Sequence, residues 1–98
     1  MTSKRETLFK NKVREDLKTL KNIWFMKIQQ VALRGTPDFL LCVNGRFVAI
    51  ELKKDGDADV ARLQEYHLNQ IRDAKGLSYL ITPKEWPKVF TELKALAS

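Results

Sequence analysis

The chain has 98 residues, 44% hydrophobic and 31% charged, which predicts one small folded domain (1–98) rather than a disordered segment. Its formal net charge of +6 favours a polyanionic partner such as nucleic acid or an anionic membrane surface. The single cysteine, Cys42, excludes an intrachain disulfide and a cysteine-built metal cluster, and no apolar run reaches the roughly 20 residues that span a membrane.

The first predicted element is a helix over residues 5–21, after a flexible terminus at 1–4. Its apolar residues recur at helical spacing on one stripe, at Phe9, Val13, Leu17 and Leu20. Residues 23–31 are rich in β-branched and aromatic side chains and predict a strand. Gly35-Thr36-Pro37 follows, and its composition indicates a turn.

Two short apolar runs, 38–43 and 47–53, flank the dipeptide Asn44-Gly45. Asn and Gly tolerate the positive φ angles of a type I′ turn, so the two runs are expected to form a tight β-hairpin. This is the firmest local prediction that the sequence offers.

The remaining predicted elements are, in chain order, a polar loop at 54–59, a helix at 60–74, a strand at 77–82 and a helix at 85–97. Asp59 is expected to cap the middle helix, Gly76 to end it, and Pro87 to lie in the first turn of the last helix. The hairpin is antiparallel, whereas the helix before the fourth strand allows a parallel crossover. The sequence therefore predicts an α/β fold of order αβββαβα, with a mixed four-stranded sheet flanked by helices.

Two carboxylates are predicted to meet across the hairpin. Counting inward from the turn, Val43 pairs with Arg46, so Asp38 lies opposite Glu51. Directly opposite residues lie about 5 Å apart at their Cβ atoms, and two carboxylates at that distance repel unless a cation lies between them. A hard divalent ion such as Mg²⁺ or Mn²⁺ prefers these oxygen ligands.

Lys53 completes the predicted site. Because side chains alternate along a strand, Glu51 and Lys53 share a face, while Val48, Ile50 and Leu52 enter the core. The charged pair is therefore expected at a surface cleft, where the ammonium of Lys53 can hold a water or steady a phosphate. This arrangement suits phosphodiester hydrolysis. On their own, Glu51 and Lys53 favour an ordinary surface pair at the end of a strand. The wider constellation, from Gly35-Thr36-Pro37-Asp38 through the tight hairpin to Glu51-Leu52-Lys53, is what favours a site.

The wider pattern resembles a known group of enzymes. Pro37-Asp38 followed by Glu51-Leu52-Lys53 is similar to the motif of the PD-(D/E)xK nuclease superfamily. The segments Gly35-Thr36-Pro37-Asp38-Phe39-Leu40 and Gly45-Arg46-Phe47-Val48-Ala49-Ile50-Glu51-Leu52-Lys53, then Leu63-Gln64 and Gly76, resemble the stand-alone viral and bacterial members of its VRR-NUC family. The resemblance covers residues 6–81, although the motif itself is short.

The resemblance implies a restriction-endonuclease-like core and DNA hydrolysis with Mg²⁺ or Mn²⁺. It assigns catalysis to Asp38, Glu51 and Lys53, and places the metal on both carboxylates and the backbone carbonyl of Leu52. The family is similar to Holliday-junction resolvases, and its small members commonly act as dimers. We therefore expect a homodimer that cuts branched DNA such as Holliday junctions, in repair or recombination. The expected location is intracellular: the cytoplasm of a bacterium or phage-infected cell, or a nucleus or nucleoid.

Family members often carry an acid in the first helix. Glu6 falls near the centre of the apolar stripe, whereas Glu15 falls on the solvated side, so Glu6 is the preferred further metal ligand. Its alternative role is to favour the dipole at the helix N-terminus. Gln64 matches a family glutamine and is expected, with Arg34 and Lys54, to contact nucleic acid; ordinary solvated side chains are the alternative.

Other conspicuous side chains have structural interpretations. The only histidine, His67, is expected in the core rather than in catalysis. Trp24 and Trp86 could stack on bases, although core or dimer contacts are the commoner roles of tryptophan in so small a domain.

Two other classes of function stay open: a non-catalytic DNA-binding module that keeps the nuclease fold, and a basic interaction domain whose motif is accidental. An excess of exposed apolar residues on the last helix would favour a dimer.

Overall fold

The computed structural model describes residues 4–28, 37–52 and 58–98, without the side chains of residues 4–6, 58–61, 63 and 64. Within these ranges, three helices and four strands follow one another in the predicted order αβββαβα. They are α1 (Lys4–Leu17), β1 (Ile23–Lys27), β2 (Phe39–Val43), β3 (Arg46–Leu52), α2 (Ala58–Asp73), β4 (Leu77–Ile81) and α3 (Trp86–Ala97). The helix thus begins within the terminus that was expected to be flexible, at Lys4.

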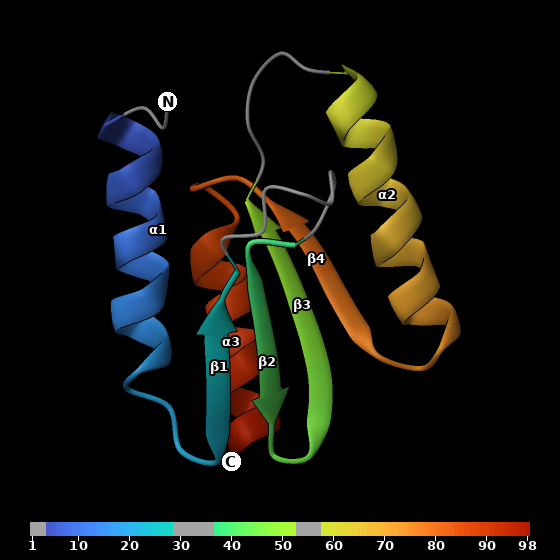
Figure 1. The fold of residues 1–98 in the computed structure, drawn as a ribbon. Coiled ribbons are helices and arrows are strands. Elements are labelled where there is room, and N and C mark those ends of the chain that lie inside the picture. The colour runs from blue at the N-terminus through green and yellow to red at the C-terminus, as the bar shows by residue number, and fades with distance from the viewer. Residues whose placement is uncertain (1–3, 29–36, 53–57) are drawn as a thin grey trace.

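The four strands form one mixed sheet in the order β1-β2-β3-β4. The first three strands are antiparallel, and β4 runs parallel to β3, as the crossover through α2 requires. In Figure 1, α3 lies behind the sheet, α1 stands beside β1, and α2 stands on the side of β4. The predicted mixed sheet is confirmed. No helix in the described part of the chain is long and apolar enough to cross a membrane.

The turn between β2 and β3 has the predicted conformation. Asn44 and Gly45 both adopt positive φ, 50° and 85°, as a type I′ turn requires. Val43 pairs with Arg46, and the register continues to Phe39 opposite Ile50. The turn therefore sets which residues of β2 and β3 face one another.

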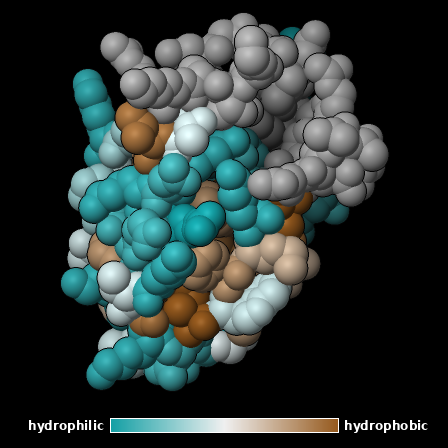
Figure 2. All heavy atoms as spheres, turned by 60° about the vertical axis from the view of Figure 1, so that its left-hand side comes forward, coloured by the Kyte–Doolittle hydropathy of each residue, from teal (hydrophilic) through white to brown (hydrophobic). Residues whose placement is uncertain are grey.

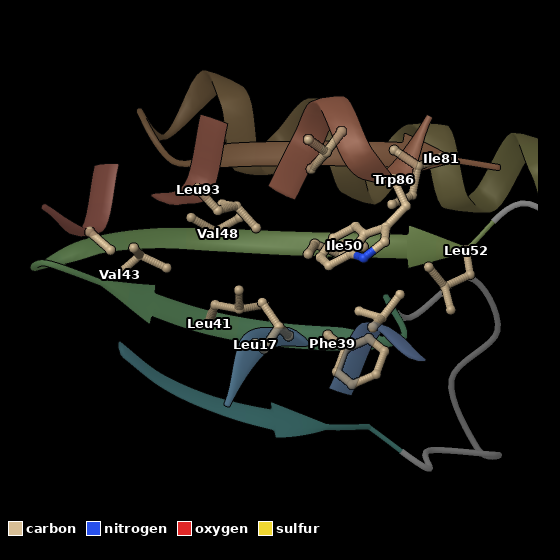
Figure 3. Packing of buried hydrophobic residues seen from close by; sticks show 13 residues of the cluster. Leu17, Phe39, Leu41, Val43, Val48, Ile50, Leu52, Ile81, Trp86 and Leu93 are labelled. Carbon is tan, nitrogen blue, oxygen red and sulfur yellow. The ribbon is translucent and has the colours of Figure 1, made fainter. Parts of the chain in front are cut away.

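The hydrophobic core lies between the sheet and the pair of helices α1 and α3 (Figure 3). On β3, Val48, Ile50 and Leu52 are buried on this face, as the alternation predicts. Helix α1 ends at Leu17, four residues before the predicted end. Of the predicted stripe, Val13 and Leu17 are fully buried, while Phe9 and, beyond the helix, Leu20 pack against the core from its margin. The outer side of α1 is turned to the solvent, and Figure 2 shows a face on which hydrophilic side chains predominate.

Trp86 connects the two helices of this layer. Its side chain is buried, and its indole Nε1 donates a hydrogen bond to Oδ2 of Asp16 at 2.8 Å. A buried indole N–H needs such an acceptor. Trp86 is therefore a core residue and has no ring face to offer to a base.

The ends of α2 differ from their predicted form. The helix begins at Ala58, so Asp59 lies inside its first turn and not before it. At the other end Lys75, with φ 75°, adopts the left-handed conformation, and the N–H of Gly76 donates to the carbonyl of Ile71 at 2.9 Å. A Cβ at Gly76 would lie 2.9 Å from Ile71 Cγ2 and 3.2 Å from Phe47 Cδ1. Gly76 is thus required for close packing and not for positive φ.

Candidate metal and nucleic-acid site

Asp38 lies immediately before β2, one step beyond the Phe39–Ile50 pair, and so opposite Glu51 in the continued register. Its Oδ2 accepts a hydrogen bond from the backbone N–H of Leu52 at 2.7 Å. Its backbone carbonyl accepts another from the N–H of Ile28, also at 2.7 Å. Asp38 is therefore held from both neighbouring strands, at the end of the hairpin where the motif residues were expected to meet.

A lysine from α1 approaches the same carboxylate. Lys10 Nζ lies 3.6 Å from Oδ1 of Asp38, and the two side chains are only 12% and 13% exposed. Shielding from solvent strengthens such an ion pair relative to a surface pair. Lys10 is not among the site residues predicted from the sequence. Its spacing from Val13 and Leu17, three and seven residues, is helical and could have placed it on the inward stripe.

Glu51 is buried, and this corrects the expectation of a surface cleft. Its exposed fraction is 2%, and it pairs with Leu80 of β4 in the parallel register. Since the neighbours of Glu51 on β3 point into the α1–α3 core, Glu51 itself lies on the face that α2 covers. A carboxylate in such a position interacts strongly with any cation that reaches it, because water screens the charge less.

The structure does not describe the side chains of several predicted site residues. Lys53, Lys54 and Arg34 lie outside the described residues, and Glu6 and Gln64 are placed only as helical backbone in α1 and α2. Among the described side chains, no group of three or more His, Cys, Asp or Glu could hold a metal ion. The described structure therefore brings together Asp38, the backbone of Leu52 and, unexpectedly, Lys10.

The donors that are present fit a hard divalent cation. Asp38 and Glu51 supply carboxylate oxygens, and the Leu52 carbonyl belongs to the residue whose N–H already holds Asp38 in place. The ammonium of Lys10 already lies beside Oδ1 of Asp38, so it competes with a metal ion for this carboxylate. A metal ion bound there would share the carboxylate with the ammonium of Lys10 or displace it.

The remaining candidates take different positions. His67 is half-buried, with the edge of its ring against Tyr66 at 5.5 Å between centroids. Trp24 is 58% exposed on β1, so its ring is open to a partner. The large hydrophobic side chains that the description leaves exposed are Leu8, Trp24, Met26, Phe47 and Tyr66. None of them lies on α3, so α3 does not show the excess of exposed apolar residues that would favour a dimer.

Comparison of the chain with protein-family models, with curated proteins and with solved structures found no match. The resemblance to the VRR-NUC family therefore depends on the motif residues themselves.

Proposed function

We propose that this protein is a Mg²⁺- or Mn²⁺-dependent endonuclease that hydrolyses phosphodiester bonds of DNA. The observation that carries the proposal is the hairpin register, which sets Asp38 opposite Glu51 where β3 runs towards Lys53. The net charge of +6 favours a polyanionic substrate. The fold, in this proposal, is a restriction-endonuclease-like core.

In this mechanism the carboxylates of Asp38 and Glu51, together with the Leu52 carbonyl, would hold the ion. The ion, when bound, supplies a Lewis acid and lowers the pKa of a water molecule. The Leu52 N–H fixes the orientation of Asp38 before any substrate binds. The proposed role of Lys53 is to hold the attacking water or steady the charge on the phosphate. Glu6 is a further proposed ligand, and Gln64, Arg34 and Lys54 are proposed contacts to the DNA backbone.

The proposed substrate is branched DNA, such as a Holliday junction, cut by a homodimer. Recognition of DNA shape is the proposed basis for selectivity, because branched DNA differs from a linear duplex in shape rather than in sequence. Two active sites related by a two-fold axis would suit paired cuts across a junction.

The test is cleavage of labelled four-way junction, flap and linear duplex DNA in Mg²⁺, Mn²⁺ or EDTA. Wild type is compared with Asp38→Asn, Lys53→Ala and the matched control Lys12→Met, whose lysine is exposed and pairs only with Asp16 among the described residues. We expect metal-dependent cutting that the first two changes reduce at least a hundredfold and the control leaves unchanged. Junction binding without cutting in either metal would overturn the enzyme and favour a DNA-binding module.

A further inference from the structure

An aromatic row crosses the open face of the sheet. Trp24 pairs with Cys42, and Cys42 pairs with Phe47, so the three residues form one row over β1, β2 and β3. Paired residues of antiparallel strands point to the same face. Their chain neighbours point into the α1–α3 core, so the row lies on the opposite face.

None of the described helices lies over this part of the face. Among the described elements, α2 contacts β4 and β3, and in Figure 1 no helix lies in front of β1 and β2. Trp24 is 58% exposed and Phe47 45%, and Cys42 between them is exposed as well. In the next row Met26 is 49% exposed. The two aromatic rings rise from strands about 10 Å apart, with a small side chain between them.

By strand alternation, the row and Asp38 share one face of the sheet. Phe47 packs against the turn after α2, where its Cδ1 lies 3.2 Å from the Cβ position of Gly76. Along β2, Cys42, Leu40 and Asp38 share this face, because side chains alternate, whereas on β3 the path from Phe47 through Ala49 to Glu51 is buried. The distance from Cys42 to Asp38 is four residues, or about 13 Å of extended strand. A few nucleotides of extended single strand would span it.

We propose that Trp24 and Phe47 form a stacking platform for unpaired bases of a single-stranded nucleic acid. Aromatic rings stack on any base, and a net charge of +6 complements the phosphate backbone of such a strand. The inference rests on the proposed function for one point, namely that the bound strand leads to Asp38 and Glu51. It specifies the substrate class as DNA with unpaired nucleotides beside the cut, as in a flap or an opened junction.

The first test measures the binding of a short fluorescein-labelled oligo-dT by anisotropy in EDTA, where no metal-dependent cleavage occurs. Trp24→Ala and Phe47→Ala should each weaken binding roughly tenfold, and Trp24→Phe should keep most of the affinity. Tyr66→Ala is the matched control, because Tyr66 is an aromatic residue with the same 58% exposure but lies on α2. Wild-type affinity in both alanine variants would overturn the platform.

A second test uses the wild-type chain. Oligo-dT should slow the reaction of Cys42 with N-ethylmaleimide at least several-fold, and a blunt linear duplex should protect it much less. Equal reaction rates with and without oligo-dT would contradict the platform.

Sedimentation decides whether a second copy of the chain covers this face instead. A wild-type dimer that Trp24→Ala dissociates, with oligo-dT binding unchanged, would overturn the proposal. Oligo-dT binding that depends on Trp24 without any DNA cleavage would refute the nuclease and leave the platform standing.

Discussion

The backbone N–H of Leu52 donates a hydrogen bond to Oδ2 of Asp38 across 2.7 Å. The bond joins the residue that ends β3 to the residue that precedes β2, so it closes the open end of the hairpin. One carboxylate oxygen thus takes a structural role while the other faces Lys10. The same side chain is therefore expected to contribute to stability and to the proposed chemistry, and the two contributions can be separated by substitution.

Asp38→Asn should cost less stability than Asp38→Ala, because the amide oxygen still accepts the Leu52 bond and only the ion pair with Lys10 is lost. Asp38→Ala removes the acceptor and should lower the free energy of unfolding by about 1–3 kcal/mol. Both changes should abolish metal-dependent cleavage, since neither side chain carries a negative charge. Urea unfolding monitored by circular dichroism measures the first effect. An equal loss of stability in both variants would contradict the role assigned to this bond.

Lys10 and a divalent ion compete for the same carboxylate. Lys10→Met removes an ammonium 3.6 Å from Asp38 Oδ1 and should tighten Mn²⁺ binding roughly tenfold, because a nearby like charge disfavours a bound cation. Isothermal titration calorimetry of the two proteins gives the ratio of dissociation constants. Lys12→Met removes an exposed ion pair with Asp16 elsewhere on α1 and should change the dissociation constant for Mn²⁺ little. Weaker Mn²⁺ binding in Lys10→Met would show instead that the lysine assembles the site.

The hairpin could be predicted because its turn depends only on two neighbouring residues. The preference of Asn44-Gly45 for positive φ sets the turn, and the turn sets the pairing of every later residue in β2 and β3. The burial of Val48, Ile50 and Leu52 then follows from alternation alone. For the same reason the position of Asp38 opposite Glu51 could be predicted, since it is an extension of the same register.

The parts that could not be predicted depend on contacts between distant elements. Glu51 is buried because its face of β3 lies under another layer of the fold, and strand alternation carries no information on that layer. Lys10 meets Asp38 only because α1 packs beside the end of the hairpin. The helix end at Lys75 was missed because glycine is the usual left-handed residue, and Gly76 was close enough in sequence to take its place in the prediction.

The turn after α2 predicts two substitutions of opposite sign. Lys75→Gly should stabilise the fold by about 1 kcal/mol, because glycine adopts a φ of 75° without the strain of a Cβ. Gly76→Ala should destabilise it by about 1–3 kcal/mol, because the new Cβ would lie 2.9 Å from Ile71 Cγ2. Thermal unfolding measures both. If Gly76→Ala proved as stable as the wild type, the packing of Phe47 and Ile71 around this turn would have to be looser than described.

Tyr79 predicts how stability depends on alkaline pH. Burial raises the pKa of its hydroxyl above the ordinary value of 10.0, and the charge of Glu92 and a hydrogen bond to it raise the pKa further, against a smaller opposing effect of Arg46. The folded state therefore keeps a proton that the unfolded chain releases. The resulting contribution is complete below pH 10 and is lost as the pH rises through the folded-state pKa.

We therefore expect the free energy of unfolding, measured in urea at successive pH values above about 9, to fall more steeply in the wild type than in Tyr79→Phe. The difference between the two proteins isolates the tyrosine from the lysines that titrate in the same range. Glu92→Gln should keep most of the steepness, because burial is the larger cause and remains. Identical pH profiles for wild type and Tyr79→Phe would mean that the hydroxyl is as well solvated in the folded protein as in the unfolded chain.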